Sequence, residues 1–184
     1  LGFVRRWCGA FRGRHLSCLR SRQVCRGDWW VIAGGRGDAK LARARRLGAT
    51  PDVSAAREDP VQIGKAATRG RGADVILEAA GHPLAFRQTA EAVRPGGEVI
   101  WLGKIDVTQD VSFRWGALMG EKRFRRSSYG GARPRRDFPL LAQAYLDGRL
   151  KLDELITGRC SLDGINDGFE ALRRGRSIRT VVEF

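Results

Sequence analysis

The stretch that decides the fold is residues 72–81, GADVILEAAG. Its apolar run, VIL at 75–77, has no alternation, ends at Glu78 and is followed by a glycine turn. A short run of this kind, rich in β-branched residues, predicts a strand buried on both faces, which is typical of a parallel sheet. Ligands of open parallel sheets lie beyond the carboxyl ends of the strands, so we expect Glu78 and the residues up to Gly81 to lie where a ligand binds.

Strand and helix signals alternate on both sides of this stretch. Upstream, WWVIA at 29–33 predicts a strand, and 39–47 predicts a helix after a glycine turn. Downstream, a helix that begins at Pro83 stops at RPGG, 94–97, and EVIWL at 98–102 predicts another strand. Consecutive strand, helix, strand units with short connections predict an α/β fold with a doubly wound parallel sheet of the Rossmann type.

Weaker signals complete the outline. Val53 indicates a short strand, and Asp59 with Pro60 predicts a capped helix that runs to about Thr68. His82 is expected to cap the next helix or to fill the loop before it. The elements expected beyond residue 103 are a helix at 115–119, an edge strand at 123–129, a helix at 137–147 capped by Asp137, a helix at 164–174 and a strand-like tail at 177–184.

The basic charge is concentrated near the start of the chain. The 184 residues carry a net charge of +14, and residues 1–50 hold twelve Lys and Arg against two acids. A basic arm of this kind can neutralise phosphates, but its arginines accompany no zinc-finger or RNP motif. Nucleic-acid binding is therefore the minor interpretation, and an incidental basic segment is the main one.

Cysteine spacing and hydropathy argue against further classes of protein. Cys8, Cys18 and Cys25 lie in the basic arm without a C-x-x-C pair, so free thiols are a better interpretation than a zinc site. No apolar run approaches the roughly 18 residues of a membrane helix, and the first residues lack the apolar core of a secretory signal. We expect a soluble, cytoplasmic protein.

The order of motifs resembles the carboxyl-terminal half of the zinc-containing, medium-chain alcohol dehydrogenases. The matching stretches, in family order and spacing, are AKLARARRLGAT, GRGADVILEAAG, RPGGEVIWLG, SSYGG, YLDGRLKLDELIT, INDGFEALRRG and SIRTVVEF, which together cover about residues 31–184. The resemblance implies hydride transfer between an alcohol or aldehyde and a nicotinamide dinucleotide, NAD or NADP. It also implies a homodimer in which the edge strand at 123–129 pairs with its copy.

The resemblance further implies which residues contact the cofactor. The loop of Ala79 and Ala80 would flank the nicotinamide together with Leu102, Gly103 and Lys104, and Tyr129 would lie near the same end. Arg179 would pair with the pyrophosphate, for which a guanidinium offers a rigid donor fork. Lys40 matches a lysine near the adenosine ribose, although an exposed helix lysine is an equal alternative. Gly35 stands where the family has an acid for the ribose hydroxyls, so NADP preference or weaker binding is implied.

Two parts of the family pattern are absent from this sequence. Residues 1–27 contain Gly9 and Gly13 but no G-x-G-x-x-G fingerprint, so we interpret them as an irregular basic arm with a degenerate first strand and phosphate turn. The sequence has no match to the ligands of the family's zinc ions, and we assign it no catalytic and no metal-ligating residue. Without zinc to polarise the alcohol, the chain alone is expected to be inactive.

We therefore predict three parts: the basic arm at 1–27, a Rossmann-like dinucleotide-binding domain at 28–130, and carboxyl-terminal helices and a strand at 131–184 that pack on a catalytic domain. The main prediction is a cofactor-binding part of an NAD(P)-dependent alcohol dehydrogenase. Two alternatives stay open. One is a zinc-free enone or quinone reductase of the same superfamily, and the other is a basic nucleic-acid-binding protein on a degenerate Rossmann scaffold.

Overall fold

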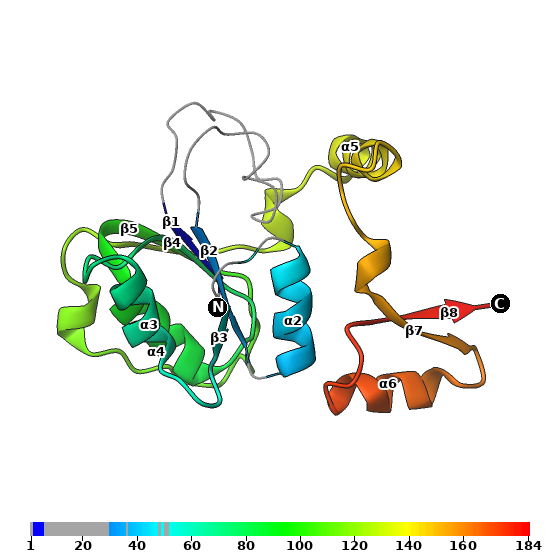
Figure 1. The fold of residues 1–184 in the computed structure, drawn as a ribbon, viewed down its shortest axis with the longest axis horizontal. Coiled ribbons are helices and arrows are strands. Elements are labelled where there is room, and N and C mark those ends of the chain that lie inside the picture. The colour runs from blue at the N-terminus through cyan, green and yellow to red at the C-terminus, as the bar shows by residue number, and fades with distance from the viewer. Residues whose placement is uncertain (1, 6–29, 36, 48, 50–51) are drawn as a thin grey trace. The chain divides into compact units, whose positions relative to one another are not determined.

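The structure is a computed structural model that describes every residue except 1, 6–29, 36, 48 and 50–51. Its contacts divide the chain into two compact units, Leu1–Gly130 and Gly131–Phe184, and each is described by itself. Figure 1 shows the first unit with its strands and covering helices, and the second with a smaller sheet.

The first unit is built on a six-stranded sheet with the order β3-β2-β1-β4-β5-β6. Its strands are β1 (Gly2–Arg5), β2 (Trp30–Gly35), β3 (Asp52–Ser54), β4 (Ala73–Glu78), β5 (Val93–Trp101) and β6 (Arg123–Arg126). Its helices are α2 (Asp38–Arg46), α3 (Pro60–Ala67) and α4 (Pro83–Ala92), with a 3₁₀ turn, η2 (Trp115–Leu118), where a longer helix was expected. In Figure 1, α3 and α4 lie on one side of the strands and α2 on the other, which confirms the doubly wound α/β prediction.

Capping residues fix the starts of two of these helices. The Asp59 carboxylate accepts a hydrogen bond from the Val61 amide at 2.9 Å, and Nδ1 of His82 accepts one from the Leu84 amide at 3.2 Å. In each case a proline follows the cap, and its fixed φ suits the first helical position. Both caps are confirmed, and they set the points at which the chain leaves β3 and β4.

The core of the first unit lies between the sheet and the pair α3 and α4. Ile76 and Val99, at the centres of β4 and β5, are fully buried against Val61 and Ala92 of the two helices. Val75 and Leu77 on the other face of β4 are only half-buried by the described residues. The expectation of complete burial on both faces is therefore met on one face.

The direction of β1 differs from the prediction of a wholly parallel sheet. Residues 2–5, predicted to belong to an irregular arm with a degenerate first strand, form a strand between β2 and β4 and pair antiparallel with both, with Gly2 opposite Ala33 and Leu77. All pairs that do not involve β1 are parallel. An antiparallel strand satisfies the backbone groups of its neighbours as fully as a parallel one, so the short apolar segment can fill this place in reverse.

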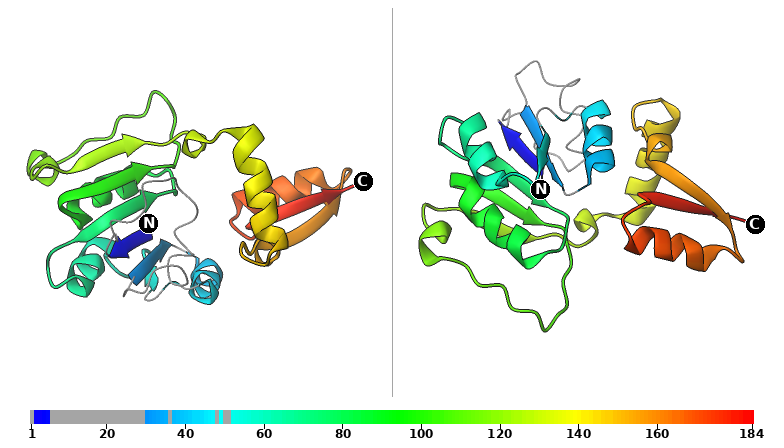
Figure 2. Two further views of the ribbon diagram at one scale, coloured as in Figure 1. Left: turned by 90° about the horizontal axis from the view of Figure 1, so that it is seen from above. Right: turned by 60° about the horizontal axis from the view of Figure 1, so that its bottom comes forward.

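The second unit contains η3 (Tyr129–Gly131) at its boundary, α5 (Pro134–Leu146), η4 (Asp153–Leu155), β7 (Ile156–Ser161), α6 (Ile165–Arg173) and β8 (Arg179–Glu183). Strands β7 and β8 pair in parallel, and Figure 2 shows α6 alongside them. Strand β7 was not predicted, because its short alternating pattern lacks a continuous apolar run. Helix α5 begins three residues earlier than expected because Pro134 occupies its first position, and Asp137 instead accepts a hydrogen bond from the Arg133 amide at 2.7 Å.

Candidate functional site

The loops that follow β4 and β5 come together at one edge of the sheet. Glu78 and Trp101, the last residues of these neighbouring parallel strands, are paired in register. The backbone carbonyl of Glu78 accepts hydrogen bonds from the amides of Leu102 and Gly103 at 2.7 and 2.9 Å. The structure thus brings together the five residues predicted to flank a nicotinamide, which are Ala79, Ala80, Leu102, Gly103 and Lys104.

The side chain of Glu78 lies beneath these loops and not on their surface. It is fully buried, and its Oε1 accepts hydrogen bonds from the amides of Ala80 at 2.8 Å and Gly81 at 2.9 Å. Oε2 is also buried and has no hydrogen-bond partner among the residues that the structure describes. Glu78 thus lies at the expected edge of the sheet, but its carboxylate is turned into the protein, where it holds the following turn.

Two glycines allow the loops to approach this closely. A Cβ atom at Gly103 would overlap Oε2 of Glu78 and the backbone nitrogen of Gly81, and would lie 2.7 Å from the Gly81 Cα. Gly81 has a φ of +65°, and a Cβ there would overlap the carbonyl oxygen of Lys104. Neither position has space for a side chain, so the two loops form one closely packed pair.

Gly35 lies at the same edge of the sheet. Gly2 is paired with Ala33 on one side and Leu77 on the other, so the ends of β2 and β4 are level and about 10 Å apart, two strand spacings. Gly35 is the last residue of β2 and pairs with Ser54, the last residue of β3. We call this edge, where β2, β3, β4 and β5 end, the carboxyl edge.

Polar groups gather near Gly35 on α2 and on the turn after β3. Asp38, at the start of α2, forms a bidentate ion pair with Arg57 at 2.7 and 3.1 Å. The hydrogen bond from Arg57, and then its charge, lower the pKa of the Asp38 carboxyl below its ordinary value. Lys40 is exposed on the first turn of the same helix. The sequence did not predict the ion pair, since its members are far apart in the chain.

Tyr129 follows the end of β6. It is 82% exposed and has a φ of +53°, which is uncommon for a residue with a side chain. The amide of Ser127 donates to the carbonyl of Trp101 at 2.9 Å, so the chain leaves β6 beside the end of β5. Tyr129 thus follows the carboxyl edge, and its place by the nicotinamide remains a prediction.

Arg179 belongs to the second unit, where it begins β8. Its side chain is exposed, and its backbone carbonyl lies 3.3 Å from the hydroxyl of Thr157, which donates to it. The predicted contact with a pyrophosphate depends on the relation between the two units, so it stays a prediction.

The degenerate phosphate turn expected after the first strand, with Gly9 and Gly13, lies outside the described part of the chain and stays a prediction. Of its surroundings the structure describes β1, whose last residue, Arg5, pairs with Trp30, the first residue of β2.

The described residues also show whether side chains that could bind a metal lie together. Within the described part of the chain, no group of three or more His, Cys, Asp or Glu side chains is arranged to hold a metal ion. Cys8, Cys18 and Cys25 lie outside that part. The described residues therefore do not form a zinc site.

The chain belongs to the zinc-binding dehydrogenase family, whose sequence profile matches residues 26–146. It is 34% identical over 155 residues to S-(hydroxymethyl)glutathione dehydrogenase of Aspergillus oryzae, covering 83% of this chain and 40% of that relative. It is 35% identical over 114 residues to alcohol dehydrogenase class-3 of Cereibacter sphaeroides, covering 61% of this chain and 30% of the relative.

A solved structure shares the same fold. Benzyl alcohol dehydrogenase from Acinetobacter calcoaceticus superposes with a TM-score of 0.78 and 25% identity, covering 83% of this chain and 42% of that chain. The chain thus spans less than half the length of the relatives it matches. Among the described residues, no helix has both the length and the apolarity needed to span a bilayer.

Proposed function

We propose that this chain is the nicotinamide-dinucleotide-binding part of an alcohol dehydrogenase that transfers hydride between an alcohol or aldehyde and NAD or NADP. The observation that carries the proposal is the convergence of the loops after β4 and β5 at one edge, level with the end of β2. Dinucleotides bind across this edge in doubly wound sheets. Family membership supports the same reaction class.

The proposal assigns the described residues to two ends of the cofactor. Ala79, Ala80, Leu102 and Lys104 are exposed on the paired loops and would contact the nicotinamide ring, which accepts or donates the hydride when bound. Gly35 and Lys40 would lie by the adenosine ribose. The pyrophosphate would be met by Arg179, whose guanidinium offers a rigid donor fork to phosphate oxygens.

We assign substrate activation to residues other than those described here. In zinc dehydrogenases the metal polarises the alcohol, and the described residues offer no ligand set for it. Exposed apolar side chains on α5 and on α6, which lie on opposite sides of β7 and β8 in Figure 1, support further packing surfaces. They include Phe138, Leu140, Leu146, Phe169 and Leu172. We propose that one or both of these surfaces pack on the part of the dehydrogenase that carries the metal.

A second copy of the chain is the proposed partner at β6. This strand is at one end of the sheet order. Its arginines have partners within the chain, and Arg123 donates to the Gly96 carbonyl at 3.5 Å. Arg125 pairs with Glu98 at 2.7 Å, and Arg126 donates to the Gly103 carbonyl at 2.9 Å. Glu98 therefore balances the charge of Arg125. Pairing β6 with its copy would extend the sheet without leaving that charge unbalanced.

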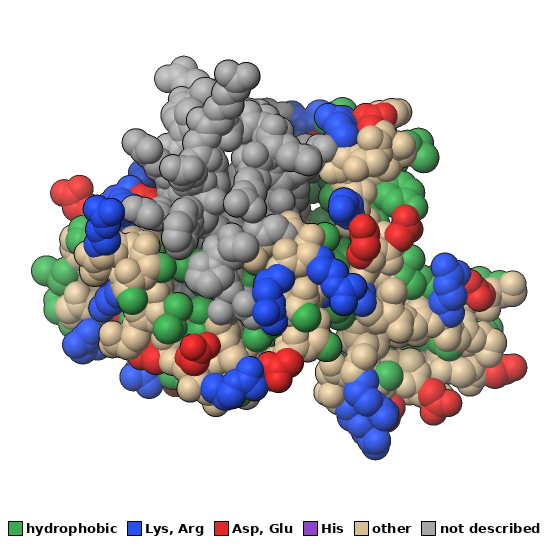
Figure 3. Space-filling view, viewed as in Figure 1, with side chains coloured by type: hydrophobic (Ala, Val, Ile, Leu, Met, Phe, Trp, Pro, Cys, Tyr) green, Lys and Arg blue, Asp and Glu red, His purple; other side chains and the backbone are tan. Residues whose placement is uncertain are grey.

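Thermal unfolding in the presence of cofactor tests the proposed function. NADH or NADPH at about 100 times its dissociation constant should stabilise the folded chain by about 2.7 kcal/mol, raising Tm by roughly 5 to 15 °C. Duplex DNA at low salt is the comparison ligand, although on the face shown in Figure 3 basic and acidic side chains are interspersed. A rise with DNA and none with either dinucleotide would favour the nucleic-acid alternative and contradict the proposal.

Cofactor preference should respond to the residue at position 35. We expect Gly35→Asp to raise the ratio of NADH to NADPH affinity about tenfold, because a carboxylate accepts from the ribose hydroxyls and repels a 2′-phosphate. The position has room, since a Cβ there lies 3.5 Å from the Leu41 side chain. Gly35→Asn is the matched neutral control, and fluorescence titration measures both ratios. An unchanged ratio in Gly35→Asp would place the ribose elsewhere.

A further inference from the structure

We infer that Glu78 is a positioning residue whose buried carboxylate sets the nicotinamide end of the cofactor site. It would act through the loops 79–81 and 102–104 without touching the cofactor. This inference rests on the proposed function for the identity of the ligand, but the loop arrangement that it explains is present in the free chain.

Glu78 accepts hydrogen bonds from backbone amides of both loops. The Glu78 side chain accepts from Ala80 and Gly81, and its backbone carbonyl accepts from Leu102 and Gly103. Hydrogen bonds from backbone amides to an ionisable acceptor are among the stronger ones in proteins. The first loop is therefore tied to the second through a single residue at the end of β4.

The location of Glu78 argues that its role is more than packing. It is fully buried at the end of a strand whose preceding residues are apolar, and Oε2 has no partner among the described residues. Burying an acid with an unpaired oxygen costs stability, and an apolar side chain of similar volume would avoid that cost. What an apolar side chain cannot provide is an acceptor for the Ala80 and Gly81 amides.

The buried side chain also fixes the distance between the loops. Oε2 lies against Gly103, where even a Cβ would overlap it. Oε1 meanwhile holds the turn at Gly81, whose backbone lies against Lys104. Loss of the carboxylate would free the first turn and open space beneath the second loop, so both surfaces that would meet the ring are expected to shift.

Cofactor fragments can separate a positioning role from a general effect on folding. ADP-ribose contains the adenosine and pyrophosphate portions of NADH but lacks the nicotinamide. In calorimetric titrations of the full chain, Glu78→Ala should weaken NADH binding about tenfold or more and leave ADP-ribose binding within about twofold. Glu78→Gln should restore most of the NADH affinity, because its amide oxygen can accept the same two hydrogen bonds.

Hydrogen exchange supplies a readout that needs no cofactor. In the free chain, Glu78→Ala should speed exchange in peptides that contain 79–81 and 102–104 about tenfold and leave peptides from α4 unchanged. The matched control is Asp74→Asn, another buried acid at the opposite end of β4. It should lower stability without altering exchange in the loops or the ratio of NADH to ADP-ribose affinity.

The outcomes for the two proposals are distinct. If the unmodified chain binds neither NADH nor ADP-ribose, the proposed function fails, and exchange in the loops still decides the role of Glu78. If Glu78→Ala leaves that exchange unchanged, or weakens NADH and ADP-ribose equally, the positioning role is overturned. Faster loop exchange with a selective loss of NADH affinity, reversed in Glu78→Gln, would support it.

Discussion

Gly103→Ala is expected to destabilise the first unit by about 3 kcal/mol, at the upper end of the range for overpacking a core. The added Cβ would overlap the buried Oε2 of Glu78 and the backbone of Gly81. Backbone atoms and a buried carboxylate cannot turn aside as the end of a flexible side chain can. To remove this overlap the two loops would have to separate, and the hydrogen bonds from Leu102 and Gly103 to the Glu78 carbonyl would lengthen. Urea unfolding followed by circular dichroism measures the loss.

The matched control is Gly116→Ala in η2. No atom lies within 4 Å of a Cβ built at Gly116, so we expect a change within about 0.5 kcal/mol. A loss below about 1 kcal/mol in Gly103→Ala would show that the loops can relax without cost. It would also contradict the view that their spacing is fixed by Glu78.

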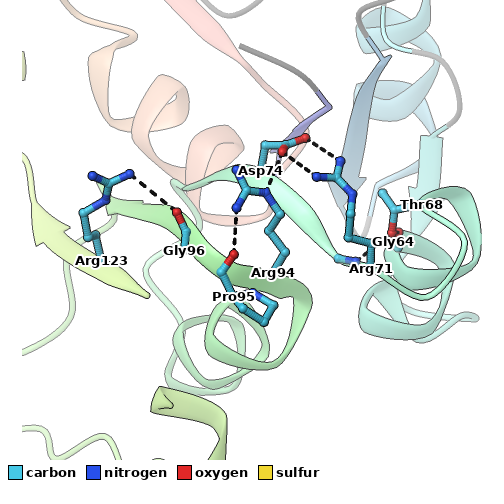
Figure 4. Close-up of polar contacts among 9 residues, drawn as sticks. Gly64, Thr68, Arg71, Asp74, Arg94, Pro95, Gly96 and Arg123 are labelled. Atoms are coloured by element: carbon cyan, nitrogen blue, oxygen red, sulfur yellow. Dashed lines mark hydrogen bonds and ion pairs between the residues drawn. The ribbon is translucent and has the colours of Figure 1, made fainter. Parts of the chain in front are cut away.

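Asp74→Ala is expected to cost about 2 to 4 kcal/mol, because it leaves two guanidinium groups without their shared counter-ion. Asp74 is the second residue of β4 and is buried. Its carboxylate accepts two hydrogen bonds from Arg71, at 2.9 and 3.0 Å, and one from Nε of Arg94 at 2.6 Å. Figure 4 shows both guanidinium groups directed at this carboxylate. The expected cost is less than for a fully buried pair, since the Arg71 side chain is half-exposed.

An exposed pair of the same geometry serves as the comparison for Asp74. Asp38 binds Arg57 in the same bidentate manner, but both side chains are mostly exposed, so Asp38→Ala should have a much smaller effect. Because the folded-state pKa of Asp38 is lowered, its contribution is present above the ordinary value of 3.8 and is lost as the pH falls through the folded value. Equal losses of stability in Asp74→Ala and Asp38→Ala would show that burial does not explain the larger effect expected at Asp74.

Local signals with a physical mechanism predicted much of the fold. The Asp59 and His82 caps, each followed by proline, placed the starts of α3 and α4, because capping satisfies amides that the helix itself leaves free. The apolar runs of β4 and β5 predicted strands because short apolar runs with β-branched residues are typical of buried strands. Residues 79–81 and 102–104 could be placed together because parallel neighbours end at the same edge.

Non-local features were not predictable in this way. The direction of β1 depends on how a short segment pairs with distant strands, and the four residues GFVR carry no information on direction. The pairing of Asp38 with Arg57 likewise depends on the fold. The buried position of the Glu78 side chain did have a signal in the sequence, but that signal allowed a different interpretation. An acid that ends an apolar strand just before a glycine turn can reach the amides two and three residues ahead.

The reversed first strand has a practical consequence for anyone who handles this protein. Gly2 lies level with Ala33 and Leu77, so a purification tag joined ahead of it would emerge between the strands that frame the carboxyl edge. A tag after Phe184 would instead extend from the exposed end of the second unit. Titrations with dinucleotides are therefore best performed on a carboxyl-terminally tagged chain.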